Sequence, residues 1–361
     1  MTDDNGKKRA QRVLVTGNNG YIGSVLAPYF AQAGHQVVGL DTGYYAGCTL
    51  VPDSDAIPCM RKDIRNIELS DLEGFDAVVH LAALSNDPIG NMNEKWTEEI
   101  NHHSSVRLAE LAKKAGVRRF LFSSSCIMYG MSEAAVVTEE SPLDPKTEYA
   151  RSKVKSERAI YELASDGFSP TFLRNGTVYG VSPRMRFDTV LNDLMGMAMT
   201  TGKVTLYSDG KPWRPVVHVK DVSRAFLTVL EAPLADVWNQ AFNNGANHLN
   251  HQIFELAEIA VKTVPGCKLE VMSQPGADQR TYKADFGKFA RVFPDFSFQW
   301  SAQRGARELY ETFKKIGLTH DQFVDKRFTR LKWLRHLLDS GRLDQSLRWQ
   351  QNSAQTAMEG V

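Results

Sequence analysis

A tyrosine and a lysine four residues apart, Tyr149 and Lys153, have the types and spacing that suit acid–base chemistry. Residues four apart share one face of a helix, so the phenol and the ammonium can act together. Lowering the pKa of a phenol from about 10 to about 7 takes about 4 kcal/mol. One unit charge at about 4 Å supplies roughly that much at an effective dielectric of about 20, which predicts that Lys153 activates Tyr149. The alternative is an ordinary amphipathic helix, because any long helix offers such spacings by chance.

The composition is that of an ordinary globular protein. The 361 residues, 42% of them hydrophobic, have room for two domains or one large elaborated domain. A net charge of +1 leaves no electrostatic footprint for nucleic acid or for a membrane surface, so an anionic ligand must be bound locally. Four cysteines without C-x-x-C spacing predict reduced thiols in a cytoplasmic protein. The polar N-terminus and the lack of a long apolar run predict neither a signal segment nor a membrane span.

A glycine-rich turn lies near the N-terminus, between an apolar run at 13–15 and a helical pattern. Gly17, Gly20 and Gly23 read G-x-x-G-x-x-G, and strand, glycine turn and helix follow in the order that a dinucleotide site requires. The second strand ends in Asp41, eighteen residues after Gly23. A carboxylate there can accept hydrogen bonds from a ribose diol and would repel a 2′-phosphate, which predicts NAD rather than NADP. The alternative for Asp41 is a solvated carboxylate in a turn.

Strands and helices alternate through the first half of the chain. Apolar runs at 77–83 and 120–122 are typical of strands buried on both faces, and a helix is expected at 100–115. This alternation predicts an α/β fold with a doubly wound (Rossmann) parallel sheet, in which ligands bind at the carboxyl ends of the strands. The serines at 123–125 end one strand and so lie where chemistry is expected, although three serines in a row are most often loop residues.

The alternation becomes irregular after a strand at 171–174, which predicts a smaller, discontinuous α/β substrate domain. The expected elements are a helix at 189–199, a strand at 204–207, a helix capped by Asp221, a return strand at 237–243, a helix at 250–264, a strand at 268–272 and a helix at 302–315. We assign 12–180 and about 215–245 to the Rossmann domain, and 181–214 and 246–320 to the substrate domain. The tail at 321–361 favours a surface helix docked by its leucines over a partner-binding or membrane element.

Five motifs in this order carry a family resemblance: G-x-x-G-x-x-G, Asp41, H-L-A-A, the S-S-S strand end and Y-x-x-x-K. Between about residue 12 and about residue 315 the chain resembles the extended short-chain dehydrogenase/reductases, which act mostly on nucleotide sugars. Within them it is similar to the UDP-galactose 4-epimerase branch and its epimerase/dehydratase relatives. The resemblance implies bound NAD, a nucleotide-diphosphate-sugar substrate and a homodimer. The dimer would pair helices whose outer faces carry Leu108, Leu111, Ile160 and Leu163.

The resemblance also implies roles for single residues. The catalytic group would be Ser125, Tyr149 and Lys153: the tyrosine takes a proton from a sugar hydroxyl, the lysine lowers the tyrosine pKa, and the serine hydrogen-bonds the reacting oxygen. With Tyr149 and Lys153, the residues that would hold NAD are Gly17, Asn19, Gly20, Tyr21, Ile22, Gly23, Asp41, Asp63, Ile64, Leu81, Ala82, Ala83 and Asn101. Those that would contact the substrate are Ser125, Cys126, Thr177, Arg214 and Arg280, with the arginines at the diphosphate. No metal site is expected.

Two departures from the family pattern bear on the reaction. Thr177 stands where many relatives have a substrate-contacting Asn, and Cys126 and Ile127 stand where the 4,6-dehydratases have Asp-Glu. We therefore predict an NAD-dependent nucleotide-sugar epimerase that acts at C4 through a transient 4-keto sugar. The alternatives are a reductase of a nucleotide-linked ketosugar or a dehydratase. A non-catalytic NAD-binding sensor or scaffold is a different class, which the presence of all three catalytic residues disfavours.

Overall fold

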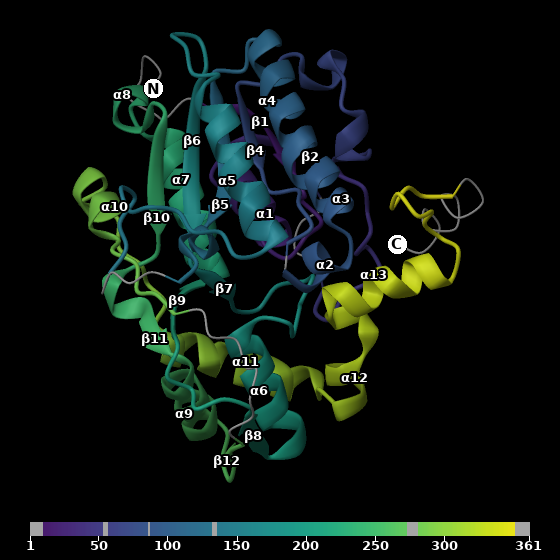
Figure 1. Ribbon diagram of the computed structural model, residues 1–361, viewed down its shortest axis with the longest axis vertical. Coiled ribbons are helices and arrows are strands. Elements are labelled where there is room, and N and C mark those ends of the chain that lie inside the picture. The colour runs from purple at the N-terminus through teal and green to yellow at the C-terminus, as the bar shows by residue number, and fades with distance from the viewer. Residues whose placement is uncertain (1–9, 53–56, 86, 132–135, 273–280, 351–361) are drawn as a thin grey trace.

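The computed structural model describes residues 10–52, 57–85, 87–131, 136–272 and 281–350 (Figure 1). Its main feature is a seven-stranded parallel sheet in the order β10-β6-β5-β4-β1-β2-β3. The strands are β1 (Arg12–Thr16), β2 (Gln36–Asp41), β3 (Cys59–Arg61), β4 (Ala77–His80), β5 (Arg119–Ser125), β6 (Ser169–Asn175) and β10 (Gln240–Asn244). The strand order runs outward from β1 in both directions, which confirms the doubly wound α/β fold.

Helices cover both faces of this sheet because its strands are apolar on both sides. Along β5, Phe120 and Phe122 pack into the core beneath α4 (Ser104–Lys114) and α5 (Glu148–Tyr161). Leu121 points the other way, into the core shared with α1 (Gly23–Gln32) and α7 (Val219–Glu231). Successive residues of a strand face opposite sides, so a continuous apolar run has to be buried on both. Short helices connect the layers: η1 (Ile64–Asn66), η2 (Leu69–Leu72), α2 (Asp87–Met92), α3 (Glu94–Thr97), η4 (Cys126–Tyr129), α8 (Leu234–Val237) and α10 (Gly287–Val292).

A second, smaller lobe lies below the carboxyl ends of the main strands in Figure 1 and has a core of its own. Three helices form it, α6 (Val190–Thr201), α9 (Ile253–Thr263) and α11 (Ala302–Ile316). Its sheets are small: β8 (Lys203–Leu206) pairs with β12 (Lys268–Val271), and β9 (Trp213–His218) lies between β7 (Thr177–Tyr179) and β11 (Asn250–Gln252), after the turn η5 (Asn247–Leu249). Nearly every element expected from the sequence in this half is present, with its ends shifted by a few residues.

Three local predictions differ from the structure, two of them only in detail. The helix expected at 100–115 begins with a π-helical turn, η3 (Glu98–His103), before α4. Asp221 does not cap α7, because the helix begins earlier and His218 is its N-cap, with Nδ1 accepting from the Lys220 amide at 3.2 Å. The Asp221 carboxylate is fully buried instead, where Arg224 and the Trp300 amide donate to it. The first three residues of the helix expected at 250–264 are strand β11.

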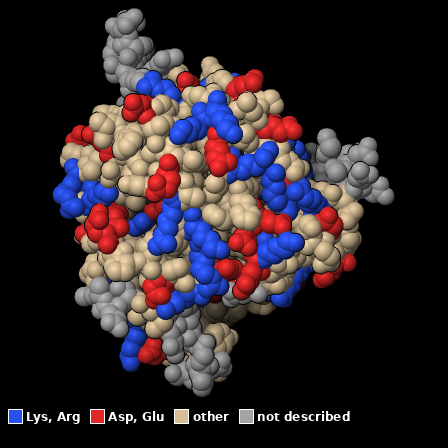
Figure 2. Space-filling view, turned by 45° about the horizontal axis from the view of Figure 1, so that its top comes forward, with Lys and Arg blue, Asp and Glu red and all other residues tan. Residues whose placement is uncertain are grey.

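The apolar residues expected on a dimer face belong to the protomer core. Leu108 and Ile160 are fully buried between their helices and the sheet, and Leu111 and Leu163 pack, half-buried, against the same cluster. That part of the prediction is wrong, because α4 and α5 turn their apolar faces to the sheet. On the face drawn in Figure 2, basic and acidic side chains are interspersed, in line with the small net charge.

The tail docks onto the Rossmann part of the molecule. It continues from α11 through α12 (His320–Val324) and η6 (Lys326–Phe328) to α13 (Arg330–Asp339), which lies close to α2 in Figure 1. Trp333, Leu334 and Leu337 enter the core cluster beneath α4, as the leucine spacing indicates. In the described residues, no helix has the length and apolarity to cross a bilayer.

Candidate active site

A cavity of about 610 Å³ lies where the sheet meets the smaller lobe. Its lining includes the residues that follow the carboxyl ends of β1, β2, β4, β5 and β6, together with residues of the second lobe such as Thr189, Ser208 and Ile253. This is the edge at which parallel α/β sheets bind ligands. The cavity is within the usual size range of small-molecule sites, about 300–1,000 Å³.

The glycine turn forms one wall of the cavity, and the packing around it leaves no room for a side chain at Gly17 or Gly23. Gly17 has a φ of +73°, and a Cβ there would lie 2.8 Å from the Ala82 amide nitrogen. A Cβ on Gly23 would lie 2.1 Å from the Gly17 carbonyl oxygen. The turn therefore presents bare backbone to the cavity directly before the N-terminus of α1, an arrangement that suits the pyrophosphate of a dinucleotide. All of the predicted turn residues except Asn19 line the cavity, namely Gly17, Gly20, Tyr21, Ile22 and Gly23.

Asp41 lies at the end of β2 and lines the cavity. Its two carboxylate oxygens accept from backbone amides, Oδ1 from Gly43 at 2.6 Å and Oδ2 from Asn19 at 3.2 Å. Burial raises the pKa of Asp41, and these two hydrogen bonds and the charge of Arg61 oppose that shift. Asn19 thus fixes the carboxylate through its backbone. Each oxygen keeps further acceptor capacity for a ribose hydroxyl.

The other predicted cofactor residues fall into two groups. Asp63, Ile64, Leu81, Ala82 and Ala83 line the cavity. Asn101 is not among the lining residues: its Oδ1 accepts from the Leu84 amide at 2.8 Å, and its Nδ2 donates to the Leu84 carbonyl at 3.1 Å. Asn101 does not face this cavity, and its contact with the cofactor stays a prediction. It fixes the loop after β4, whose residues do face the cavity.

Ser125 and Tyr149 both line the cavity. Ser125 ends β5, Tyr149 lies in the first turn of α5, and the serine hydroxyl is close enough to the phenol to lower its pKa. Burial raises the pKa of Tyr149 to about 12, and the nearby Asp87 carboxylate adds to that, while Arg186 and the Ser125 hydroxyl oppose it. The phenol is protonated at neutral pH in this structure. The pair is placed to hydrogen-bond a substrate oxygen.

Lys153 lies one turn beyond Tyr149, behind the cavity wall. Its Nζ donates to the Ser123 carbonyl at 2.8 Å and lies 5.8 Å from the centre of the Tyr149 ring. Burial lowers the pKa of Lys153 to about 7. The prediction that Lys153, helped by an oxidised nicotinamide ring, lowers the tyrosine pKa stays a prediction. In this structure exclusion of water disfavours the charged form of both groups.

A buried acidic residue that the sequence reasoning missed lies one further turn along α5. Glu157 accepts from the Ser124 hydroxyl at 2.8 Å and pairs with Arg174 at 2.5 Å. Its negative charge raises the pKa of Lys153 and so opposes the effect of burial. The sequence could have predicted this position, since a spacing of four residues places Glu157 and Lys153 on the same face of a helix.

The predicted substrate residues are only partly brought together. Thr177 and Arg214 line the cavity from β7 and β9. Arg280 lies outside the described residues. Cys126 is fully buried, its thiol donates to the Arg174 carbonyl at 3.1 Å, and burial raises its pKa. It is not a lining residue, whereas Ile127 is, so the predicted substrate contact of Cys126 is corrected.

Several lining residues come from segments that the sequence did not connect with the site. Arg186 forms a 2.5 Å ion pair with Asp188, whose Oδ2 also accepts from the Arg330 amide at 3.1 Å. The Arg330 guanidinium, at the start of α13, lies 4.4 Å from the centre of the Tyr45 ring. The tail therefore contributes Arg330 to the lining of the cavity. No spacing in the sequence indicated this, because the partners are far apart along the chain.

Comparison with known proteins agrees with this architecture. A family model described as the NAD dependent epimerase/dehydratase family matches residues 13–245. The UDP-glucose 4-epimerase of Mycolicibacterium smegmatis is 31% identical over 60% of this chain and 72% of its own length, and that of Bacillus subtilis is 26% identical over 82% and 94%. The structure of MoeE5 in complex with UDP-glucuronic acid and NAD is 28% identical, with a TM-score of 0.73 over 84% of this chain and 99% of that one. On the evidence of the family match, the chain belongs to the NAD-dependent epimerase/dehydratase family.

Proposed function

We propose that the protein is a nucleotide-sugar epimerase that inverts C4 through a transient 4-keto sugar. The observation that carries the proposal is that Ser125 and Tyr149 lie close to each other in the same cavity as the glycine turn. An epimerase of this kind has to hold a sugar hydroxyl and a dinucleotide in one enclosed space. The remaining catalytic member, Lys153, lies directly behind the tyrosine.

The residues suggest a division of labour in this reaction. When bound, oxidised NAD supplies a hydride acceptor and one positive charge on its nicotinamide ring. Tyr149 takes the proton of the C4 hydroxyl as the carbon is oxidised, and gives it back as the carbon is reduced. Ser125 donates a hydrogen bond to the same oxygen. Thr177 and Arg214 line the side of the cavity from which the sugar and its diphosphate would be held.

The surroundings of Ser125 favour epimerisation over elimination of water. Elimination requires a placed acid and base at neighbouring ring carbons. The residue after Ser125 is Cys126, a buried thiol with a raised pKa, and the next is the apolar Ile127. Epimerisation at C4 moves only the hydroxyl proton and the hydride, so it needs no further acid–base pair.

A dehydratase is the second candidate, and Asp87 is the observation that favours it. Asp87 lines the cavity, accepts from the Thr147 hydroxyl at 2.6 Å and is close enough to Tyr149 to raise the tyrosine pKa. A carboxyl group beside the phenol has the chemistry of a general acid or base.

Products formed in heavy water separate these reactions. The purified protein with its bound NAD is incubated with a panel of UDP-hexoses, chosen because the relatives are UDP-glucose 4-epimerases, and the products are analysed by NMR and mass spectrometry. We expect the C4 epimer without deuterium and without net change in NADH. Deuterium uptake with loss of water, abolished by Asp87→Asn, establishes the dehydratase instead. In a parallel incubation with a UDP-linked 4-ketosugar and added NADH, stoichiometric oxidation of NADH establishes a ketosugar reductase.

We further propose that the enzyme works as a homodimer in the cytoplasm. The dimer follows from the resemblance alone. All four cysteines, Cys48, Cys59, Cys126 and Cys267, are free thiols, which suits a reducing compartment.

A further inference from the structure

The last described segment of the tail, residues 343–349, lies against the Rossmann part of the molecule, and we call it the C-terminal clamp. It follows α13 and closes on itself through a bridge between Leu343 and Trp349. Its neighbours are the loop at 42–45, which follows β2, and the loop at 62–66, which follows β3. Thr42, Tyr44, Asp63 and Ile64 from these two loops line the cavity on either side of Asp41.

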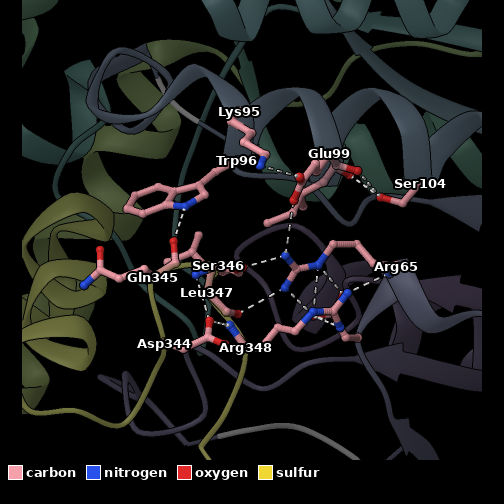
Figure 3. Close-up of polar contacts among 12 residues, drawn as sticks. Arg65, Lys95, Trp96, Glu99, Ser104, Asp344, Gln345, Ser346, Leu347 and Arg348 are labelled. Carbon is pink, nitrogen blue, oxygen red and sulfur yellow. Dashed lines mark hydrogen bonds and ion pairs between the residues drawn. The ribbon is translucent and has the colours of Figure 1, made fainter.

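Three successive carbonyl oxygens of the clamp accept hydrogen bonds from the Rossmann part, as Figure 3 shows for Trp96 and Arg65. Trp96 Nε1, from α3, donates to Gln345 at 2.7 Å. Arg65 Nη1 donates to Ser346 at 2.6 Å. Arg65 Nη2 donates to Leu347 at 3.2 Å, and the Tyr44 hydroxyl donates to that oxygen too.

The clamp is held in one defined conformation. Leu347 has a φ of +58° and a fully buried side chain. A non-glycine residue keeps such a backbone conformation only where its surroundings enforce it. Arg348 adds contacts to the second loop, with Nη1 2.9 Å from Asn66 Oδ1 and 3.8 Å from Asp63 Oδ2. These contacts are those of a docked element, not of a trailing end.

The clamp also fixes the first loop. Trp349 Nε1 donates to the Thr42 carbonyl at 2.7 Å, and the indole lies 6.0 Å from the Tyr44 ring, centre to centre. From α13, Trp333 Nε1 donates to the Tyr44 carbonyl at 2.6 Å. The Arg61 guanidinium, at the end of β3, lies 5.8 Å from the centre of the Trp349 ring. Both loops beside Asp41 are thus tied to the tail by residues, including 343–349, that do not themselves line the cavity.

We propose that the C-terminal clamp completes the adenosine half of the NAD site by positioning the loops at 42–45 and 62–66, and that it slows the release of NAD. Surface loops are the segments of a protein that open most readily, and a dinucleotide beside Asp41 can leave only when its covering loops move. Tying both loops to a docked tail removes that freedom. The cofactor then stays bound between turnovers, which serves any reaction that returns its hydride to the same sugar.

The test measures release of NAD from the full-length holoprotein without any sugar. The double variant Trp96→Phe/Trp349→Phe keeps both aromatic rings and removes the N–H donors to Gln345 and Thr42. Holoprotein is diluted into an excess of an enzyme that destroys free NAD, and the NAD still bound is quantified over time. We expect release to become about tenfold faster, the effect of losing two ordinary hydrogen bonds. Trp238→Phe is the matched control, because it removes an indole N–H that donates to Ser165 elsewhere on the surface, and its release rate should equal that of the wild type.

A second variant detaches the clamp more strongly. Leu347→Asp places a carboxylate at a fully buried position, so the clamp has to leave its seat. Hydrogen exchange then reports whether the loops at 42–45 and 62–66 lose protection, and circular dichroism confirms that the protein is folded. Release within twofold of the wild type in this variant would overturn the proposal, and so would equal acceleration in Trp238→Phe. Since no sugar is present, neither result bears on the proposed epimerisation.

Discussion

At the scale of single residues, burial sets the chemistry of the proposed catalytic group. Bringing the pKa of Tyr149 from about 12 to about 7 requires about 7 kcal/mol. One unit charge at about 4 Å supplies only about 4 kcal/mol at an effective dielectric of about 20, and burial lowers the pKa of Lys153 to about 7, which disfavours its charged form. Lys153 alone is therefore insufficient. A second positive charge beside the phenol is needed before the tyrosine can act as a base.

The first prediction concerns the phenol oxygen. Tyr149→Phe keeps the ring and removes the only group of the side chain that can carry the proton, so the variant should fold, bind NAD and lose turnover by at least about 100-fold. Steady-state assay with the best sugar of the panel measures kcat, and calorimetry measures NAD affinity. Tyr161→Phe, on the exposed face of the same helix, is the control and should retain full activity. More than about a tenth of the activity remaining in Tyr149→Phe would remove Tyr149 from its role.

The second prediction concerns the stability cost of Lys153. Its pKa is lowered to about 7 in the folded protein, whereas in the unfolded chain it is about 10.4. Between these two values only the unfolded chain binds the proton. The free energy of unfolding therefore rises with pH by up to about 1.4 kcal/mol per pH unit, as the destabilisation caused by burying Lys153 decreases. We expect Lys153→Met to stabilise the protein most at pH 7 and progressively less toward pH 10. Urea unfolding at pH 7, 8 and 9 measures the free energy of unfolding of the variant relative to the wild type. For the control Lys155→Met, on the exposed face of α5, this difference should not change with pH. The prediction is contradicted if the difference in unfolding free energy between Lys153→Met and the wild type is also the same at every pH.

At the scale of elements, the sequence predicts what depends on neighbours along the chain. The glycine turn and Asp41 were predictable because one strand, one turn and one helix place them. Asn101 was expected to face the cofactor, but its side chain holds a loop that it touches only after folding, through the amide and carbonyl groups of Leu84. Asp221 was misplaced because Arg224 and the Trp300 amide draw its carboxylate into the interior, while His218 caps α7. Long-range contacts decided these cases.

The third prediction belongs to the end of β2. Two backbone amides hold the Asp41 carboxylate beside the cavity. A 2′-phosphate placed there would be repelled by the negative charge of this carboxylate. We expect the wild type to bind NAD at least about 100-fold more tightly than NADP, since two like charges at about 4 Å repel each other by several kcal/mol at an effective dielectric of about 20. Asp41→Ser should lose most of that preference in calorimetric titrations. Asp236→Ser, at an exposed position, should keep it, and tighter binding of NADP by the wild type is the result that defeats the prediction.

At the scale of the whole molecule, the cavity joins parts of the chain that no local pattern connects. The Rossmann part contributes the glycine turn and Tyr149, the second lobe contributes Arg214, and the tail contributes Arg330. The two-domain division at 181–214 and 246–320 remains a prediction. The sequence identified the tail as a docked helix but gave no sign of its place beside the cavity, because α13 and Tyr45 are distant in sequence.

The last prediction concerns assembly, where the structure changes the expected interface. With Leu108 and Ile160 inside the protomer, the outward faces of α4 and α5 carry charged residues and one large exposed side chain, Tyr161, which is 51% exposed. A dimer formed through these faces would be polar, and screening by salt would weaken its charge contacts. We expect a dimer mass by light scattering at micromolar concentration and low salt, and partial dissociation at about 0.5 M salt, where the Debye length falls to a few ångströms.

Tyr161→Glu should yield a monomer, because it places a charge among the contacts. Tyr207→Glu, equally exposed but on the second lobe, should remain dimeric. A monomer mass for the wild type under all conditions rules the dimer out, and a dimer indifferent to Tyr161→Glu places its interface on another face of the molecule.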